Sequence, residues 1–480
     1  MKQLEPGQTL DGFTIDAPLH AGGMADLYRV HCVDTARQPD FPLLLKVPRL
    51  KTDEGGENLV GFETEKQILA ALHGPHVPRF MAAGNIVRPY LVMEFVPGET
   101  LQQWLDRKPP RDAQEIARLG ALVADALHAL HQQGACHLDL KPANVMIRAS
   151  GDSAVLLDFG LSRHAQLPDL LAEEQRSAVG SYGWIAPEQI VGVRGDPRSD
   201  IFALGVILYE MCTGELPFGN PQTAGGLRQR FWMQPRPPRQ HDARIPAWLQ
   251  EIILGCIEPL AENRYASAAL LAFDLANPDQ VKVTARGEAT HGAGFGAQLQ
   301  RWMTRADYRP SALPTQAPPP PIVMVAVPHR DASEAVLEAL RQAVKRTLGN
   351  RPGARLSCVT VVPPRASGGA DDELSIHQKL LEYLRAWLAK IDLGTHVATC
   401  HVLEAGDVAH ALLTYAAGNH ANIMILGAAT HGLQLQRFVA TVPIKVAMRA
   451  PCTVMLVKPP GGARESFSTS EGDLPFPTAG

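Results

Sequence analysis

The pattern of apolar and polar positions divides the chain into two ordered regions. Residues 11–276 alternate short apolar runs with longer segments of helical periodicity, which predicts a region of mixed α and β structure. Residues 322–458 repeat a different unit, in which a continuous apolar run is followed by an amphipathic helix. Continuous apolar runs are typical of strands that are buried on both faces. The second region is therefore predicted to be a parallel sheet with helices on both faces.

The individual elements of this second region follow from the same pattern. Strands are expected at 322–327, 356–362, 396–403, 422–427 and 452–457, and helices at 332–348, 373–391, 408–418 and 442–449.

Two segments lack this periodicity. Residues 277–321 end in a proline-rich stretch from Pro314 to Pro321, which cannot continue a helix and favours an extended spacer. Residues 459–480 are rich in Gly, Ser, Pro and acidic residues, and such a composition predicts disorder. We therefore expect a domain at 11–276, a Pro-rich linker at 277–321, a second domain at 322–458 and a disordered tail.

Composition narrows the class of protein. A chain of 480 residues with 45% hydrophobic and 20% charged residues can form two or three domains, each with its own core. Its formal net charge of −4 gives no reason to expect nucleic acid or an anionic membrane as a partner. The seven cysteines include no C-x-x-C pair, which indicates a reduced, cytoplasmic location. No run of about 18 apolar residues is present, so no membrane span is expected.

Polar residues in the middle of the first region carry a chemical signal. The chain has His137-Leu138-Asp139-Leu140-Lys141-Pro142-Ala143-Asn144 and, a short hairpin later, Asp158-Phe159-Gly160. Phosphoryl transfer from a metal–nucleotide needs a carboxylate that faces the acceptor hydroxyl, a cation that neutralises the transferred group, and an amide and a carboxylate that hold magnesium. The two motifs contain residues of each of these kinds.

The order and spacing of these motifs resemble the catalytic loop and the metal loop of eukaryotic-type protein kinases. The resemblance to bacterial Ser/Thr protein kinases extends over about 11–276. It implies an α+β bilobal protein kinase fold, with an N-lobe at about 11–96 and a C-lobe at about 97–276. It also implies ATP and Mg²⁺ (or Mn²⁺) as cofactors and proteins as substrates.

The resemblance assigns a role to each polar residue of the two motifs. Asp139 would accept or orient the proton of the substrate hydroxyl, and Lys141 would contact the γ-phosphate. Asn144 and Asp158 would bind magnesium.

The N-lobe carries the expected nucleotide-binding residues. Gly22 and Gly23 lie where the family has its glycine-rich loop, although His20 and Ala25 replace the first and third glycines. Lys46 ends an apolar strand and matches the lysine that holds the α- and β-phosphates.

The partner of Lys46 should be a glutamate on the next helix. Glu65 fits the register best, and Glu63 is the alternative.

The segment from Tyr90 to Gly98 resembles the hinge between the lobes. Its backbone, at Glu94 and Val96, would pair with adenine, and Met93 would be the gatekeeper. The residues by themselves are equally compatible with a simple buried strand.

Leu138 departs from the family pattern, which usually has arginine before the catalytic aspartate. That arginine is a buried cation that is neutralised by a phosphate in the activation segment. We therefore expect activity that does not depend strictly on phosphorylation of this segment. Ser177 and Ser181 are the candidate phosphorylation sites, with Ser177 preferred. Ser181 also aligns with a family Ser/Thr that forms hydrogen bonds near the catalytic aspartate.

Three further residues match structural anchors of the C-lobe. Glu188 closes the activation segment and would form an ion pair with Arg264. Asp200 matches the residue that holds the backbone of the catalytic loop.

The region 322–458 resembles a universal stress protein domain, an α/β fold with a five-stranded parallel sheet. Many members bind ATP through a motif with three glycines. Here only Gly427 is kept, while Thr430 and Ala440 replace the other two at the same spacing. His329 and its neighbours stand where members that bind ATP often have an acidic residue. We favour a regulatory role or homodimerisation for this domain, with ATP binding as the alternative.

The sequence thus predicts a Mg-ATP-dependent Ser/Thr protein kinase. It would transfer the γ-phosphate to Ser or Thr hydroxyls of proteins and autophosphorylate, and a C-terminal stress-protein domain would tune its output. One alternative is a pseudokinase scaffold that signals by protein contact without phosphoryl transfer. Another makes the C-terminal domain the main actor, with the kinase as its regulator.

Overall fold

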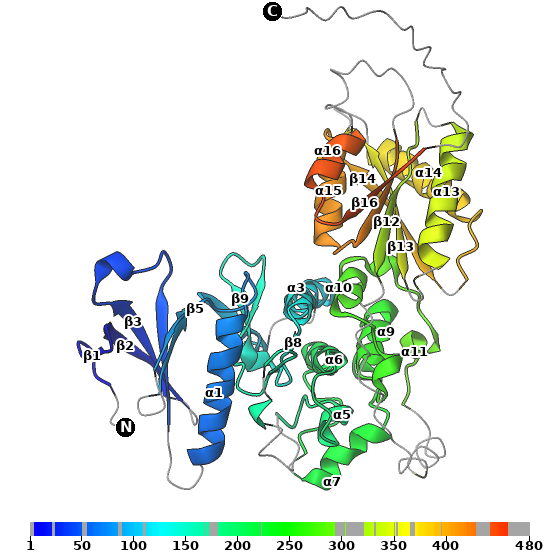
Figure 1. Cartoon of the computed structure of the whole chain (residues 1–480). Helices are drawn as coiled ribbons and strands as arrows, with labels where there is room; N and C mark the ends of the chain where they lie inside the picture. Colours follow the sequence, from blue (N-terminus) through cyan, green and yellow to red (C-terminus); the bar gives the residue numbers. More distant parts are fainter. Residues whose placement is uncertain are drawn as a thin grey trace, which may run out of the picture. The chain divides into compact units, whose positions relative to one another are not determined.

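The computed structural model separates the chain into two compact units, Met1–Pro319 and Pro320–Gly480 (Figure 1). The residues that it describes are 4–21, 25–49, 55–84, 89–108, 112–167, 169–171, 181–221, 223–292, 303, 321–330, 333–349, 351, 354–364, 370–394, 396–428 and 442–458.

The first unit begins with an antiparallel sheet. Its six strands lie in the order β1-β2-β3-β4-β6-β5, with one long helix, α1, beside them. Ile15, Leu43, Leu45 and Val92 are at most 1% exposed and form the centre of its core. The elements are β1 (Thr9–Leu10), β2 (Phe13–Ala21), β3 (Ala25–Cys32), β4 (Leu43–Pro48), α1 (Gly55–Ala71), β5 (Phe80–Ala83) and β6 (Leu91–Glu94).

The rest of the first unit is mainly helical. Its helices are α2 (Leu101–Asp106), α3 (Ala113–Gln132), α5 (Pro187–Ile190), α6 (Arg198–Thr213), α7 (Ala224–Leu227), α8 (Pro238–His241), α9 (Ala247–Cys256), α10 (Ala268–Ala276) and α11 (Ala285–Glu288). Its short strands are β7 (Gly98–Thr100), β8 (Ala135–Cys136), β9 (Val145–Arg148), β10 (Ala154–Leu156) and β11 (Arg163–His164).

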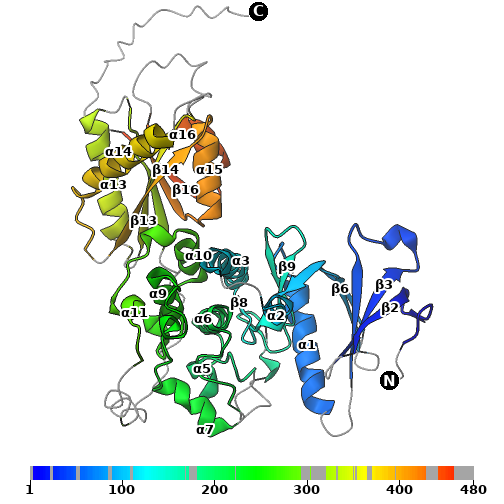
Figure 2. The same ribbon diagram turned by 180° about the vertical axis from the view of Figure 1, so that it is seen from behind.

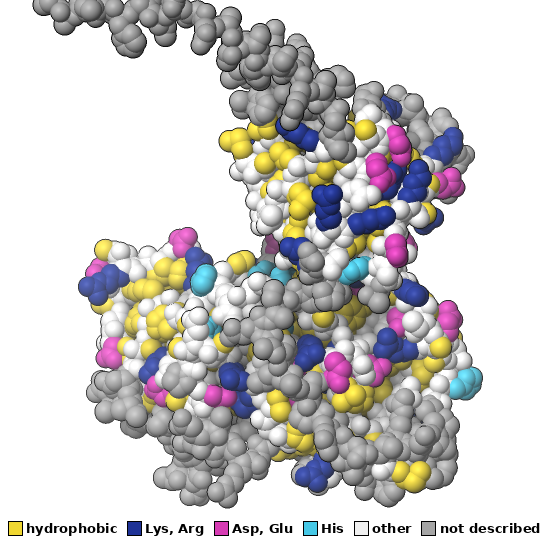
Figure 3. Space-filling model, turned by 45° about the vertical axis from the view of Figure 1, so that its right-hand side comes forward, with side chains coloured by type: hydrophobic (Ala, Val, Ile, Leu, Met, Phe, Trp, Pro, Cys, Tyr) yellow, Lys and Arg dark blue, Asp and Glu magenta, His cyan; other side chains and the backbone are white. Residues whose placement is uncertain are grey.

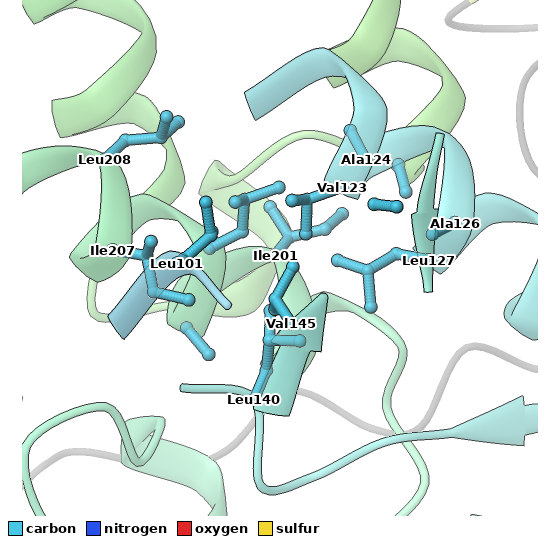
Figure 4. Packing of buried hydrophobic residues seen from close by; sticks show 14 of the residues in the cluster. Leu101, Val123, Ala124, Ala126, Leu127, Leu140, Val145, Ile201, Ile207 and Leu208 are labelled. Atoms are coloured by element: carbon cyan, nitrogen blue, oxygen red, sulfur yellow. The ribbon is translucent and has the colours of Figure 1, made fainter. Parts of the chain in front are cut away.

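The helix α6 lies at the centre of this helical part. It is apolar nearly all round, so almost every one of its residues is buried, and it ends at Gly214, whose φ of 75° suits glycine. Ile201 of α6 belongs to the same cluster as Val123 of α3 and as Leu140 and Val145, which flank the polar residues of the catalytic motif (Figure 4). The core thus fixes both ends of the segment that carries Lys141 and Asn144.

The helical unit continues beyond the predicted domain end at Ala276. Residues 277–292, which were predicted to belong to the linker, carry the 3-10 turn η5 (Pro278–Gln280) and the helix α11. Glu251 of α9 accepts hydrogen bonds from the backbone N–H of Thr284 and of Gly287. Gln250 donates to the backbone carbonyls of this segment. Polar side chains of α9 therefore bind the backbone of 277–292, and hydrophobic periodicity cannot reveal such contacts.

The second unit is a five-stranded, wholly parallel sheet in the order β14-β13-β12-β15-β16, as the sequence predicted. Its elements are β12 (Ile322–Ala326), α13 (Glu334–Gly349), β13 (Arg355–Val362), α14 (Ala370–Leu388), β14 (Val397–Glu404), α15 (Val408–Gly418), β15 (Ile423–Gly427), α16 (Val442–Arg449) and β16 (Thr453–Val457).

Helices cover both faces of this sheet. The helices α13 and α14 pack on one face and α15 and α16 on the other (Figures 1 and 2). Alternate residues of the same strand supply the two cores, as Val325 and Met324 do in β12. This arrangement explains why the strands of this region are continuous apolar runs.

Two properties bear on the environment of the protein. Within the described ranges, none of the helices combines the length and the apolar character that a transmembrane span requires. Acidic and basic side chains are interspersed with hydrophobic ones on the face that Figure 3 shows.

A substitution at Gly205 tests the central packing of α6. A Cβ atom at this position would lie 2.4 Å from Cys256 Cβ, which cannot move without shifting the backbone, and 2.8 Å from Ile257 Cγ2. We expect Gly205→Ala to lower the free energy of unfolding by about 1–3 kcal/mol, since overpacking outweighs the gain in helix propensity. Urea unfolding of the full chain, monitored by the hydrogen exchange of peptides from α6, measures the stability of this unit alone.

The control is Gly225→Ala in α7, where a Cβ atom would meet nothing within 4 Å. This variant should be at least as stable as the wild type. Equal stability of the two variants would show that α6 and α9 are not packed as closely as described.

Candidate active site

The catalytic loop is held by one buried carboxylate. Asp200, in the first turn of α6, is 0% exposed and accepts the backbone N–H of His137 at 2.9 Å and of Leu138 at 2.8 Å. The ring Nε2 of His131, on α3, lies 2.8 Å from the same carboxylate. Burial alone would raise the pKa of Asp200. The hydrogen bond to His131 and the backbone donors reverse this effect, so the pKa lies below its usual value.

Leu138 adopts a backbone conformation that is rare for its residue type. Its φ of 63° lies in the left-handed region, which typically costs about 1–3 kcal/mol for a residue other than glycine. The N–H of Leu138 is bound by Asp200, and its C=O accepts a hydrogen bond of 2.8 Å from Gln189 Nε2. Bonds on both sides of the residue hold this conformation, and with it the direction in which Asp139 leaves the loop.

Asp139 is the centre of a polar cluster. Its Oδ2 accepts from Lys141 Nζ at 2.9 Å and from Asn144 Nδ2 at 3.3 Å, and its Oδ1 accepts the backbone N–H of Ser181 at 2.8 Å. Lys141 Nζ also donates to the hydroxyl of Ser181 at 2.9 Å. The structure thus brings the catalytic motif together with Ser181, 42 residues after Asp139.

Lys46 joins the two lobes of the unit. Its Nζ lies 2.7 Å from Glu65 Oε2 of α1 and 3.2 Å from Asp158 Oδ1. Burial alone would lower the pKa of Lys46, but the carboxylates of Glu65 and Asp158 raise it above its usual value. Lys46 in turn is the main cause that keeps the pKa of Asp158 below its usual value. Burial raises the pKa of Glu65, and the charge of Lys46 opposes this shift.

The alternative partner for Lys46 is excluded by this geometry. Glu63 pairs instead with Lys66 on the surface of α1, at 2.5 Å. Glu65 was the preferred choice from the sequence, and it is only 2% exposed.

Asp158 and Asn144 fit a magnesium site. The Asp158 side chain is 41% exposed although its neighbours are buried, and its φ of 64° turns the chain sharply at this residue. Asn144 donates through Nδ2 to the backbone carbonyl and the carboxylate of Asp139, which leaves its amide oxygen as a ligand. Carboxylate and amide oxygens are the donors that Mg²⁺ prefers.

The predicted hinge contains a second cluster of charges. The Glu94 carboxylate is buried between Arg79 Nε at 3.1 Å and Arg148 Nη1 at 3.0 Å. Its side chain therefore ties the hinge to β9. Within the described part of the chain, the N–H and C=O of Val96 make no backbone hydrogen bond, so both remain for a ligand.

Glu188 and Arg264 form a buried bidentate pair, with N–O distances of 2.7 and 2.8 Å. The Arg264 side chain is 0% exposed and that of Glu188 is 3% exposed. Ser199 donates a third hydrogen bond to Glu188, at 2.6 Å. These contacts attach α5 to α6 and to the segment before α10.

Some predicted residues cannot be placed. Gly22, Gly23 and Ser177 lie outside the described residues. In the second unit, Thr430 and Ala440 also lie outside them.

Several contacts of the site were not found from the sequence. His131, Gln189 and Arg148 belong to no motif, and each reaches its partner over more than 50 residues. Arg230, in the 3-10 turn η3 (Arg228–Phe231), is 0% exposed and donates to the backbone carbonyls of Tyr182 at 2.5 Å and Gly183 at 2.9 Å. Burial lowers the pKa of Arg230 to about 10.

In the second unit, His329 follows β12 at the carboxyl edge of the sheet. Its Nδ1 lies 3.2 Å from the hydroxyl of Thr360. Burial, and then the charge of Arg330, lower the pKa of His329, so its ring is neutral at neutral pH.

Comparison with known proteins matches both regions to families. Residues 36–275 match the protein kinase domain family, and residues 322–458 match the universal stress protein family. The serine/threonine-protein kinase PknB of Mycobacterium leprae is 32% identical over 276 residues, which are 56% of this chain and 43% of the relative. PknB of Mycobacterium tuberculosis is 29% identical over 296 residues, or 59% and 46% of the two chains.

The serine/threonine-protein kinase Pkn1 of Myxococcus xanthus is 37% identical over 206 residues, which are 42% of this chain and 29% of the relative. The chain thus spans less than half the length of these curated relatives.

The buried pair between Glu188 and Arg264 generates a stability prediction. Arg264→Met leaves the Glu188 carboxylate buried without its cation, so the free energy of unfolding should fall by about 3–5 kcal/mol. Urea unfolding of the full chain measures this loss. The control is Arg118→Met, which removes an ion pair whose arginine is 47% exposed and should cost less than about 1 kcal/mol. Similar losses in the two variants would contradict the structural role of the buried pair.

Proposed function

The chain belongs to the protein kinase family, and we propose that it transfers the γ-phosphate of ATP to Ser or Thr hydroxyls of proteins. The observation that carries this proposal is the geometry around Lys46 and Asp139. Lys46 bridges the helix α1 and Asp158, while Lys141 and Asn144 both donate hydrogen bonds to the Asp139 carboxylate. All the charged groups that phosphoryl transfer needs are therefore present in two connected clusters.

Asp139 is the proposed base. The acceptor hydroxyl oxygen forms a bond to the γ-phosphorus, and the bond from this phosphorus to the leaving β-phosphate oxygen breaks. The Asp139 carboxylate takes the hydroxyl proton. Lys141, 2.9 Å from Asp139, supplies positive charge where the transferred group passes.

The remaining site residues are proposed to bind the nucleotide. Lys46 would hold the α- and β-phosphates, and the backbone at Glu94 and Val96 would pair with adenine. Gly22 and Gly23 would cover the phosphates. Asn144 and Asp158 would hold Mg²⁺ (or Mn²⁺), which when bound neutralises phosphate charge.

Ser181 suits a positioning role better than a phosphorylation site. It contacts both Asp139 and Lys141, and a phosphate on its hydroxyl would place negative charge beside the Asp139 carboxylate. Ser177 remains the proposed autophosphorylation site. Because Leu138 replaces the usual arginine, we expect phosphorylation there not to be required for activity.

The second unit is proposed to regulate the kinase, either alone or as a homodimer. It has two cores of its own, so it can fold independently of the kinase. The domains proposed are 11–276 and 322–458, with the kinase segment extended through the ordered residues up to 292. A cytoplasmic location and protein substrates complete the proposal.

The proposal is tested by transfer of labelled phosphate from ATP with Mg²⁺ or Mn²⁺, both to the chain itself and to a generic protein acceptor. Asp139→Asn should lower the rate by about 10²–10⁴-fold, because it removes the base. Lys46→Met should lower it by at least about 10²-fold, because it removes a charge that orients the phosphates.

The matched control is Lys66→Met, which removes a lysine of α1 whose partner is Glu63. Its rate should stay within about twofold of the wild type. Absence of transfer by the wild type under all these conditions would overturn the proposal and leave a pseudokinase scaffold. Label that persists in Asp139→Asn would assign the activity to another group or to a contaminant.

Two glutamates on the same helix provide a sharper test of the nucleotide site. Glu65→Gln breaks the ion pair with Lys46, whereas Glu63→Gln breaks only the surface pair with Lys66. A lost hydrogen bond to a charged group is worth about 1.5–3 kcal/mol, so kcat/KM for Glu65→Gln should fall roughly 10- to 150-fold. Steady-state kinetics at varied ATP should show little change for Glu63→Gln. Equal effects of the two variants would show that Glu65 is not the functional partner.

A further inference from the structure

A further ion cluster lies outside the catalytic contacts. It joins the segment between Asp158 and Glu188 to Arg194, which follows this segment. Asp169 Oδ2 lies 3.1 Å from Arg194 Nε and 3.9 Å from Arg163 Nε. The side chains of Asp169 and Arg194 are only 17% and 14% exposed. One carboxylate thus bridges a residue that precedes it in the segment and a residue that follows Glu188.

Arg194 also binds the beginning of the segment directly. Its Nη2 donates to the backbone carbonyl of Leu161 at 2.9 Å, and Leu161 directly follows Asp158-Phe159-Gly160. Arg163 makes the reciprocal contact, because its Nη1 donates to the backbone carbonyl of Arg194. The two arginines therefore hold the two ends of the segment against each other, and Asp169 supplies the negative charge between them.

Gly195 shows how closely these ends approach. Its φ is +97°, and a Cβ atom at this position would lie 2.3 Å from Arg163 Nη1 and 3.0 Å from Arg163 Cζ. Only glycine permits both this backbone conformation and this contact. The position of the Arg163 guanidinium is thus fixed by packing as well as by charge.

The cluster is connected to the catalytic loop through the backbone. Arg163 lies on β11, where it pairs with Cys136 of β8, and His137 follows Cys136 directly. The hydroxyl of Ser162 donates to the backbone carbonyl of His137 at 2.9 Å. A displacement of Arg163 would therefore also displace the residues that orient Asp139.

We propose that Asp169 is a built-in substitute for an activating phosphate, which holds the ends of the activation segment together through Arg163 and Arg194. The proposal rests on the proposed kinase function and extends it to regulation. Two arginines that converge on one anion are the usual arrangement for binding a phosphate. Here the anion is a carboxylate of the chain, which accepts a hydrogen bond from Arg194 and forms a longer ion pair, at 3.9 Å, with Arg163. A carboxylate that belongs to the chain binds these arginines without a modification step. Asp169 is thus a positioning residue, because it acts on Asp139 through Arg163 and the β8–β11 pair.

The test uses the full chain after phosphatase treatment and removal of the phosphatase. Asp169→Asn keeps the shape of the side chain but removes its charge, so kcat should fall by at least about tenfold. KM for ATP should change little, because the described contacts of the cluster lead to Asp139 through β8 and β11 rather than to Lys46. Asp169→Glu restores the charge and should recover most of the rate. Hydrogen exchange should accelerate in Asp169→Asn at residues 161–164 and 194–195 and stay unchanged in α6.

Two controls separate this effect from a general loss of stability. Glu258→Gln breaks a partly exposed ion pair with Arg286 in the same lobe, and it should keep the wild-type rate. In a double-mutant cycle, Asp169→Asn combined with Arg194→Gln should be no slower than Arg194→Gln alone, since both changes break the same contact.

The outcomes distinguish this inference from the kinase proposal. A wild type that loses its activity on phosphatase treatment, or an Asp169→Asn variant with wild-type rate and exchange, would overturn the role of Asp169. Failure of Asp169→Glu to recover the rate would equally exclude a role for the charge. If the wild type transfers no phosphate but exchange still accelerates in Asp169→Asn, the kinase proposal fails while the structural role of the cluster stands.

Discussion

The candidate site depends on the buried carboxylate of Asp200. A charge that is 0% exposed must be compensated by donors, and here the donors are the His131 ring and the backbone N–H groups of His137 and Leu138. These bonds keep the pKa of Asp200 low in spite of the burial that would raise it. The loop is therefore bound in the one conformation that presents both N–H groups to the same carboxylate. This conformation includes the left-handed Leu138, and it sets the direction of Asp139.

Leucine at position 138 is consistent with the charges around it. The side chain is 4% exposed, and an arginine in its place would bring a buried cation that needs a negative partner. The chain avoids this requirement at the catalytic loop. Two other arginines, Arg163 and Arg194, need a negative partner instead, and each forms an ion pair with Asp169. Neutralisation by a residue of the chain itself needs no modification, whereas neutralisation by a phosphate makes the contact conditional on modification.

The sequence predicted those features whose cause is local or belongs to a motif of fixed spacing. The apolar runs at 322–327 and 422–427 predicted the buried strands β12 and β15, because a strand that is buried on both faces is apolar at nearly every position. The register of α1 favoured Glu65 over Glu63, and in the structure the Glu65 carboxylate accepts a hydrogen bond from Lys46 Nζ. The contacts of Asp169, Arg230 and the Glu94 side chain could not be predicted, because their partners belong to no motif and all except Arg163 lie at least 15 residues away in the sequence. The regular structure of residues 277–292, which lie in the predicted linker, could not be predicted for a related reason. The side chains of Gln250 and Glu251 form hydrogen bonds to the backbone of residues 277–292. Such polar contacts require no hydrophobic periodicity in the segment that they bind.

The second unit shows how a retained motif residue can have a structural cause. Gly427 is the glycine that remains of the nucleotide motif, yet a Cβ atom there would lie 3.2 Å from Val336 Cγ1 of α13. A side chain at this position would thus require Val336 to shift by a few tenths of an ångström, so glycine here eases the packing of the helix on the sheet. His329, at the same edge, is kept neutral by its burial and by Arg330, so it does not replace the charge of the acidic residue found in members that bind ATP. Gly427 and His329 therefore give no positive support for a second ATP site, while Thr430 and Ala440 of the same motif lie outside the described residues.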